Sequence, residues 1–309
     1  MDNVSTIALF PGQGAQSVGM GKSFFDSLPT AQERFQEADD TLSLKLSQIC
    51  FEGPMERLTQ TEITQPALLT VSVIAFEAWR AQNPDTHIRV GAGHSLGEYS
   101  ALVASGALAF RDAVMLVHNR GKFMQGAVKE GEGSMIAVLG KELSEIEAAI
   151  TDCGETTVQI ANINAPGQVV LAGRADDVKI FCEQHSGWKI RELQVSAPFH
   201  CSLMKPAEEQ LAPLLEEVAI QTPHFPIVQN VTATLTDDPA TIRKNLVSQV
   251  CGSVRWVECI ETAVRECHVT EAIEFGSGKV LSGLMKRINK SLATGNVCEF
   301  EDVVSQPNE

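Results

Sequence analysis

The sequence predicts an α/β fold with a parallel sheet and an inserted subdomain, and three observations support it. A β-prone run at residues 88–90 leads through a tight turn into a helix-compatible segment at residues 98–107. An apolar, β-branched run at residues 4–10 predicts an opening strand. Residues 131–195 change character and predict a separate β-α-β-β-α-β unit, which matches the ferredoxin-like arrangement.

Composition supports a globular protein and disfavours several classes. The chain has 309 residues, of which 44% are hydrophobic, so it can bury a large core. Its formal net charge of −15 disfavours nonspecific binding to nucleic acid or to an anionic membrane. The eight cysteines form no C-x-x-C pair, which argues against a zinc ribbon and a disulfide framework. Without a long apolar run or a signal-like start, we expect a cytoplasmic protein.

The turn after residues 88–90 carries the candidate nucleophile, Ser95. Gly93 and Gly97 flank this serine in the G-x-S-x-G spacing of a nucleophile elbow, where larger side chains would collide with the strand or the helix. A bare match to this pattern is common. The strand before it and the small residues of the helix after it favour the catalytic interpretation.

Glycines and prolines divide the first third of the chain. The loop at residues 11–16 follows the opening strand, and its two glycines fit either backbone amides that point at an anion or a tight connector. Pro66 predicts the start of a buried helix. A further helix at residues 113–125 carries Arg120, which fits either an exposed position or one in the cleft of the elbow.

The inserted subdomain ends where the chain returns at residues 196–204. Pro166 and Gly167 predict the turn between its middle strands. Its predicted strands are residues 134–140, 157–163, 168–173 and 188–195, and its predicted helices are residues 143–153 and 175–185.

The returning loop holds His200, the histidine placed best to serve as the base that a serine nucleophile requires. A structural role is the alternative. Strands are then predicted at residues 225–231 and 271–275. The loop at residues 276–279 lacks the spacing of a P-loop and is interpreted as a turn.

Several stretches spread over almost the whole chain form one combined pattern. They are residues 9–16 (LFPGQGAQ), 93–99 (GHSLGEY), 120–121, 124–125, 162–173, 198–200 with Met204, 230–231, Gln249 with 254–256, and 278–281. Together they resemble one family, the malonyl-CoA:acyl carrier protein transacylases with the related acyltransferases of polyketide synthases. Ser253 and Ser277 stand where that family commonly has proline.

The resemblance implies an α/β-hydrolase-like core at residues 1–130 and 196–309, around the inserted subdomain at 131–195. It implies that Ser95 is acylated and that His200 is its base. The backbone amides of Gln13 and Leu96 would form the oxyanion hole. Gln249 would orient His200 through its backbone carbonyl, and Asn162 would lie near the cleft. No cofactor or metal is implied.

The implied reaction moves a malonyl group from malonyl-CoA to the phosphopantetheine thiol of an acyl carrier protein, through a malonyl-serine. Arg120 is expected to bind the free malonyl carboxylate, and Phe199 to limit room for a 2-methyl branch. Acyl-thioester hydrolysis at the same serine and histidine is the alternative. A non-enzymatic scaffold is a third, which the complete set of site residues disfavours. The resemblance also implies a monomer.

Carrier proteins are acidic as a class, and so is this chain, so docking requires a local basic patch. The densest basic clusters in segments that could flank the cleft are Lys189 with Arg191, and Lys286 with Arg287 and Lys290. Solvated surface cations are the alternative interpretation.

Overall fold

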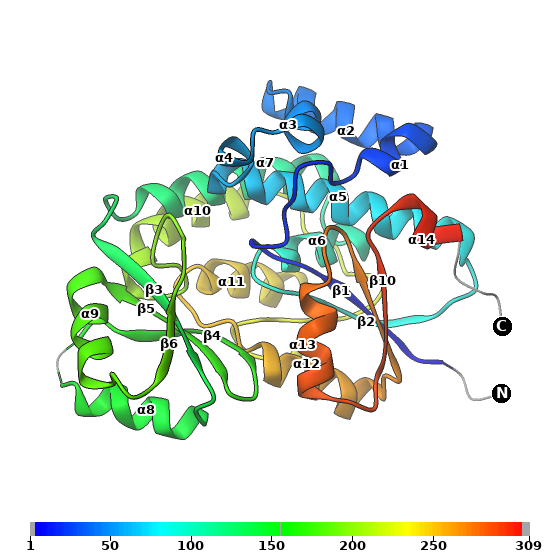
Figure 1. The fold of residues 1–309 in the computed structure, drawn as a ribbon. Helices are drawn as coiled ribbons and strands as arrows, with labels where there is room; N and C mark the ends of the chain where they lie inside the picture. The colour runs from blue at the N-terminus through cyan, green and yellow to red at the C-terminus, as the bar shows by residue number, and fades with distance from the viewer. Residues whose placement is uncertain (1–3, 155, 305–309) are drawn as a thin grey trace.

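A six-stranded, mostly parallel sheet forms the centre of the protein in the computed structural model, which describes residues 4–154 and 156–304 (Figure 1). The strand order is β10-β9-β1-β2-β7-β8, and only β8 runs antiparallel to its neighbour. The strands are β1 (Thr6–Phe10), β2 (Ile88–Gly93), β7 (Ile227–Val228), β8 (Leu235–Thr236), β9 (Glu271–Phe275) and β10 (Ala293–Val297). The predicted α/β class with a parallel sheet is confirmed.

Every residue of β1 is buried, as expected for a central parallel strand covered on both faces. Ala8 and Phe10 join one core, and Ile7 and Leu9 join another, because successive side chains of a strand point to opposite faces. The first core also contains residues of α5 (Thr61–Gln82), α6 (Gly97–Ala104), α7 (Phe110–Gly126) and α10 (Lys205–Glu217). The second contains residues of α12 (Trp256–Cys267) and α13 (Val280–Ile288).

Smaller helices pack outside α5 and α7, at the top of Figure 1. They include α1 (Lys22–Ser27), α2 (Pro29–Leu42), α3 (Leu46–Glu52) and α4 (Met55–Leu58). Of the remaining helices, α14 (Phe300–Val304) packs on α5, and α11 (Pro239–Gln249) packs on α10.

The predicted start of α5 at Pro66 is wrong, because the helix begins at Thr61 and contains Pro66 in its interior. Proline lacks the N–H that would bond to the carbonyl four residues earlier. That carbonyl belongs to Glu62, and it lies 2.9 Å from Nδ1 of His118 on α7. A partner from another helix thus takes the place of the missing helical hydrogen bond.

The inserted segment forms its own four-stranded antiparallel sheet, in the order β4-β5-β3-β6. One face carries a separate core with α8 and α9, whereas Met135, Ala137 and Val170 on the other face join the main core. The last strand is shorter than predicted. The elements are β3 (Gly133–Leu139), α8 (Leu143–Asp152), β4 (Gln159–Ala165), β5 (Gln168–Arg174), α9 (Ala175–Gln184) and β6 (Lys189–Glu192).

Strand β4 pairs with the loop between α11 and α12, outside both sheets. The amide of Ile163 donates to the carbonyl of Val254 at 2.9 Å, and the amide of Val254 donates to the carbonyl of Ala161 at the same distance. This pairing fixes one edge of the subdomain to the core. Among the described residues, no helix combines the length and apolar character needed to cross a membrane.

Candidate active site

Ser95 lies in a tight turn between β2 and α6, with a φ of +52°. A Cβ atom on Gly93 would lie 1.8 Å from the carbonyl carbon of Gly97, and one on Gly97 would lie 2.0 Å from the carbonyl oxygen of Phe10. Both positions therefore require glycine. The sequence pattern predicted this strand, turn and helix, and the structure places the serine at the carboxyl edge of the sheet.

His200 reaches Ser95 from the segment that returns from the subdomain. Its Nε2 lies 2.7 Å from the Ser95 Oγ, and its Nδ1 lies 3.0 Å from the carbonyl oxygen of Gln249 and 3.1 Å from that of Gly252. A carbonyl can only accept, so these two partners select the tautomer with a proton on Nδ1. Nε2 is then free to accept the proton of the serine hydroxyl.

The imidazole of His200 is 4% exposed. Burial, followed by the positive charge of Arg120, lowers the pKa of His200 to about 3. Both effects disfavour the imidazolium. The imidazole is therefore neutral near neutral pH and able to accept a proton at Nε2.

Arg120 extends from α7 to the same serine. Its Nη2 donates to the Ser95 Oγ at 3.0 Å and to the Gln249 side-chain oxygen at 2.9 Å, and its Nη1 donates to the Gln65 side-chain oxygen at 2.8 Å. The residue is 1% exposed, and burial lowers the pKa of its guanidinium. The sequence left open whether Arg120 is exposed or in the cleft, and the structure places it in the cleft.

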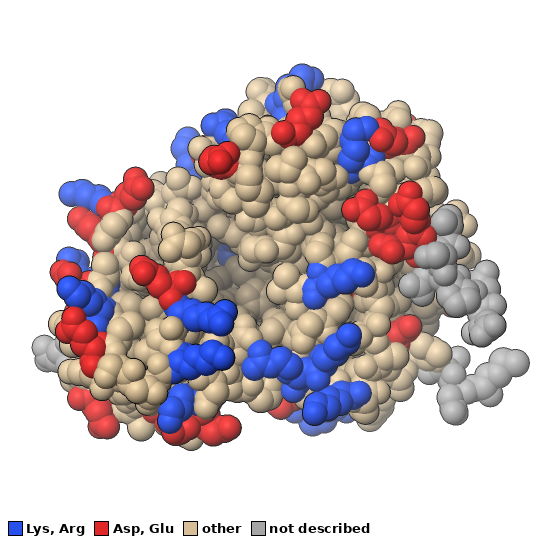
Figure 2. All heavy atoms as spheres, in the orientation of Figure 1, with Lys and Arg blue, Asp and Glu red and all other residues tan. Residues whose placement is uncertain are grey.

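A cavity of about 270 Å³ opens above Ser95 and brings six of the predicted site residues together. Figure 2 shows a hollow between the two halves of the molecule. A groove of about 820 Å³ beside α1 to α3 is larger but contains none of these residues. The cavity is lined by Gln13, Ser95, Arg120, Asn162, Phe199 and His200, with Gln65, Met124, Asn164, Leu193 and others.

Leu96 and Gln249 are buried behind this cavity instead of lining it. Gln13 follows β1 and Leu96 follows the turn after β2, so both lie at the carboxyl edge of two adjacent strands. The amide of His94 donates to the carbonyl of Phe10 at 3.0 Å and ties the turn to the end of β1. This arrangement brings the two segments with the predicted oxyanion amides side by side.

Sequence reasoning gave no role to three polar residues around the turn. The side-chain oxygen of Asn230 accepts from the Ser95 amide at 2.7 Å, and its side-chain nitrogen donates to the Gly93 carbonyl at 2.8 Å. Asn164 on β4 contacts Nε2 of His94 at 2.8 Å. Glu98, in the first turn of α6, is fully buried. A carboxylate three residues after Ser95 was the available signal.

The two serines at positions where the family commonly has proline each donate a hydrogen bond to a distant segment. Ser253 donates to the carbonyl of Ile160 on β4, next to the loop that supplies the Gly252 carbonyl to His200. Ser277 donates to the carbonyl of Ala15 at 2.7 Å, in the loop that contains Gln13. The departures therefore add contacts beside the site.

The predicted docking residues are exposed on two elements, with Lys189 and Arg191 on β6, and Lys286 and Arg287 on α13. Lys and Arg side chains gather along the lower margin of the hollow in Figure 2. Arg287 also has a structural contact, because its Nη2 donates to the carbonyl of Pro166 at 2.9 Å, in the turn between β4 and β5.

Comparison with known proteins shows similarity over nearly the whole chain. The acyl transferase domain family matches residues 8–299. The malonyl CoA-acyl carrier protein transacylase of Bacillus subtilis (strain 168) is 45% identical over 303 residues, which cover 96% of this chain and 94% of the relative. The corresponding transacylase of Escherichia coli K12 is 41% identical over 295 residues, covering 94% and 95%.

Solved structures agree with these relatives. A malonyl-transacylase in complex with a type II polyketide synthase acyl-carrier protein has a TM-score of 0.93 and 39% identity, covering 97% of this chain and 98% of that one. An acyl carrier protein S-malonyltransferase from Vibrio cholerae also has a TM-score of 0.93, with 40% identity and coverage of 97% and 99%.

We predict that the imidazole of His200 stays neutral at pH 5, because its pKa lies well below the usual value of about 6.5. Nitrogen chemical shifts of labelled histidine measure this, with His200→Gln used to assign the signals. In Arg120→Ala the pKa should rise, because the guanidinium charge that disfavours the imidazolium is lost. A His200 signal that titrates near pH 6.5 in the unmodified protein would contradict the prediction.

Proposed function

The chain belongs to the acyl transferase domain family, and we propose that it is an acyltransferase that moves malonyl from malonyl-CoA to the phosphopantetheine thiol of an acyl carrier protein. Relatives at 41–45% identity carry that activity in their names. The observation that carries the proposal is the Ser95 Oγ, which lies 2.7 Å from a neutral imidazole and 3.0 Å from a buried guanidinium.

The reaction proceeds in two half-reactions through a malonyl-serine. In the first, the Ser95 Oγ attacks the thioester carbonyl while Nε2 of His200 takes the hydroxyl proton. The backbone amides of Gln13 and Leu96 stabilise the resulting oxyanion. The carbon–sulfur bond then breaks, and the leaving CoA sulfur takes the proton from His200.

In the second half-reaction, the carrier thiol replaces CoA. His200 takes the thiol proton as the sulfur attacks the ester carbonyl, and returns it to the Ser95 oxygen when the ester bond breaks. The backbone carbonyls of Gln249 and Gly252 hold the imidazole throughout, so the mechanism uses a pair of residues without an orienting carboxylate.

Selectivity for malonyl rests on charge and on room in the cavity. The planar guanidinium of Arg120 can grip the free carboxylate of malonyl with two parallel hydrogen bonds. Acetyl has no carboxylate to fill that position. Phe199, next to His200 in the cavity lining, restricts a 2-methyl branch.

We infer that the parallel sheet and its helices form the α/β-hydrolase-like core expected for residues 1–130 and 196–309, of which the structure describes 4–130 and 196–304. Residues 131–195 form a ferredoxin-like subdomain. The two separate sheets and the strand order β4-β5-β3-β6 support this division. A monomer and a cytoplasmic location stay predictions.

Substitution of the nucleophile tests the proposal directly. Ser95→Ala should form no covalent adduct with malonyl-CoA, and His200→Ala should acylate about 10²- to 10⁴-fold more slowly, as is typical when a general base is lost. Intact-protein mass spectrometry measures the adduct. Equal adduct yield on Ser95→Ala would end the assignment, and free malonate in place of malonyl-carrier would identify a hydrolase.

Arg120→Ala should lower acylation by malonyl-CoA by about 10- to 100-fold relative to acetyl-CoA, because a hydrogen bond to a charged group contributes about 1.5–3 kcal/mol. The ratio of kcat/KM for the two thioesters is the measurement. Arg111→Ala is the matched control, since Arg111 is an exposed arginine on the same helix. Equal losses for malonyl and acetyl in Arg120→Ala would refute the role in selectivity.

Charge reversal tests the basic patch. Lys189→Glu and Lys286→Glu should raise the KM for the carrier protein and weaken its salt dependence, because charges at the rim of an interface act mainly on association. Acylation by malonyl-CoA should stay unchanged. Arg287 is avoided because it also holds the turn at Pro166.

Lys45→Glu provides the control for that experiment, because Lys45 is exposed between α2 and α3, away from β6 and α13 (Figure 1). It should leave the KM for the carrier at its original value. If the double reversal of Lys189 and Lys286 also leaves the KM for the carrier unchanged at low salt, the carrier docks elsewhere.

A further inference from the structure

Glu98 is a carboxylate with no exposed surface, placed directly behind the nucleophile in the first turn of α6. Three donors surround it. One oxygen accepts from the Gln229 side chain at 2.8 Å, and the other accepts from the Asn230 amide at 2.8 Å and from the Gln249 side chain at 3.0 Å. An ionised carboxylate only accepts, so it matches this set of donors.

Asn230, one of these three partners, also contacts the nucleophile. It accepts from the Ser95 amide and donates to the Gly93 carbonyl, and so spans both sides of the strained turn. The Glu98 carboxylate holds the Asn230 backbone from behind. The position of the Ser95 backbone thus depends on a contact that starts at Glu98.

Gln249, another of the three partners, also contacts the other two reacting groups, Arg120 and His200. Its side-chain nitrogen donates to Glu98 and to the Ser95 carbonyl at 3.1 Å, which leaves its side-chain oxygen facing Arg120 at 2.9 Å. Its backbone carbonyl accepts from His200. If the Gln249 side-chain amide were flipped, its nitrogen would face the Arg120 guanidinium, which can only donate.

The negative charge of ionised Glu98 complements the positive charge of Arg120. Burial raises its pKa to about 7, against the hydrogen bonds from Asn230 and Gln249 and the charge of Arg120, which all favour the ionised form. The titratable groups that face it are Arg120 on α7, Tyr99 on its own helix and Cys259 on α12. A buried carboxylate whose pKa is raised lowers the stability of the folded protein when it is ionised. Stability alone therefore does not explain why a glutamate occupies this position.

We propose that Glu98 is a positioning residue for the acyl transfer proposed above: through Asn230 it fixes Ser95, and through Gln249 it fixes Arg120 and His200. It touches none of the reacting atoms. It acts because one carboxylate holds two residues that contact all three reacting groups. It accepts from the backbone amide of Asn230, whose side chain contacts the Ser95 backbone. It also accepts from the side chain of Gln249, whose side-chain oxygen contacts Arg120 and whose backbone carbonyl accepts from His200.

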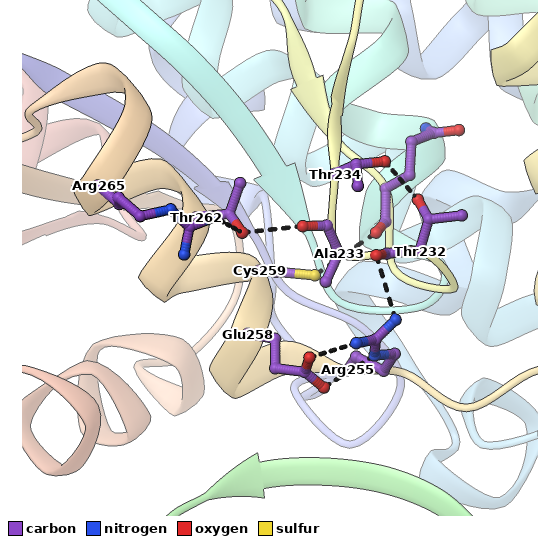
Figure 3. A network of polar contacts seen from close by, with 9 residues as sticks. Thr232, Ala233, Thr234, Arg255, Glu258, Cys259, Thr262 and Arg265 are labelled. Atoms are coloured by element: carbon purple, nitrogen blue, oxygen red, sulfur yellow. Dashed lines mark hydrogen bonds and ion pairs between the residues drawn. The ribbon is translucent and has the colours of Figure 1, made fainter.

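The turn that carries Gln229 and Asn230 has a second anchor on α12 (Figure 3). Arg255 donates to the carbonyl of Thr232 at 3.1 Å and pairs with Glu258, and Thr262 donates to the carbonyl of Ala233 at 2.9 Å. These contacts do not involve Glu98. A change at Glu98 should therefore disturb side-chain orientation and leave the turn folded.

Glu98→Gln is the sharpest variant because it keeps the shape and removes the charge. Its one oxygen can still accept from Asn230 and Gln249, while its nitrogen would face the nitrogen of Gln229. In the described part of the chain, the Gln229 side-chain oxygen is buried without a partner, so a flip of that amide would accept the new donor. Glu98→Ala removes every contact.

The measurement is single-turnover acylation by malonyl-CoA at pH 8, with thermal unfolding of each variant. Glu98→Ala should acylate on the order of 10²-fold more slowly, as expected when reacting groups are misplaced. Glu98→Gln should recover part of this and acylate about tenfold more slowly than the unmodified protein, because hydrogen bonds to a neutral acceptor are weaker. Its Tm should not fall, because an ionised buried group has been removed.

Glu274→Gln is the matched control, at another carboxylate with no exposed surface. Glu274 accepts from the amides of Leu281 and Ser282 and from the Ser282 hydroxyl, where α13 begins. This variant should lower the Tm, because the new side-chain nitrogen would face the backbone amide of Leu281 or Ser282, and a backbone amide cannot flip to accept it. It should not slow acylation. It reports what the loss of a buried, hydrogen-bonded carboxylate does when no reacting group depends on it.

Acylation of Glu98→Gln at the unmodified rate would overturn the proposal, and so would slowing that only follows a fall in its Tm. If Glu98→Ala does not fold, Glu98→Gln alone decides. The proposed function fails separately, because then the unmodified protein itself forms no malonyl adduct. A normal adduct with unaffected Glu98 variants removes only the role of Glu98.

Discussion

A serine held at positive φ between a strand and a helix is the constraint on which the rest of this structure depends. Backbone of that kind is costly for a residue with a side chain, and it persists only when its surroundings fix it. Gly93 and Gly97 let the turn and β1 approach within distances that exclude a Cβ atom. Asn230 then bonds to both sides of the turn. The strain is thereby fixed by contacts from distant parts of the chain.

The second constraint on the fold is the buried guanidinium of Arg120. Taking a charge out of water costs several kcal/mol, which its protein contacts must offset. Arg120 finds three oxygen acceptors, on Gln65, Ser95 and Gln249, and the face of Tyr99 lies 5.6 Å from its centre. An anionic substrate group would supply the negative charge that these neutral acceptors lack.

Local patterns predicted the strands, the turn at Ser95 and the order of elements in the subdomain, because each depends on neighbouring residues. The start of α5 was missed because the compensation for Pro66 comes from His118 on another helix. The roles of Asn230 and Glu98 were missed for a related reason. Their partners lie more than 130 residues away, and no periodicity records such a contact.

The pairing of β4 with Val254 restricts movement of the subdomain relative to the core on one side of the cavity. Backbone hydrogen bonds on both sides of Val254, with the Ser253 side chain beside them, tie the subdomain to the loop whose Gly252 carbonyl holds His200. A swing of the subdomain wide enough to enlarge the cavity must break this pairing or carry that loop along. The size of the cavity above Ser95 and the alignment of His200 are therefore mechanically coupled.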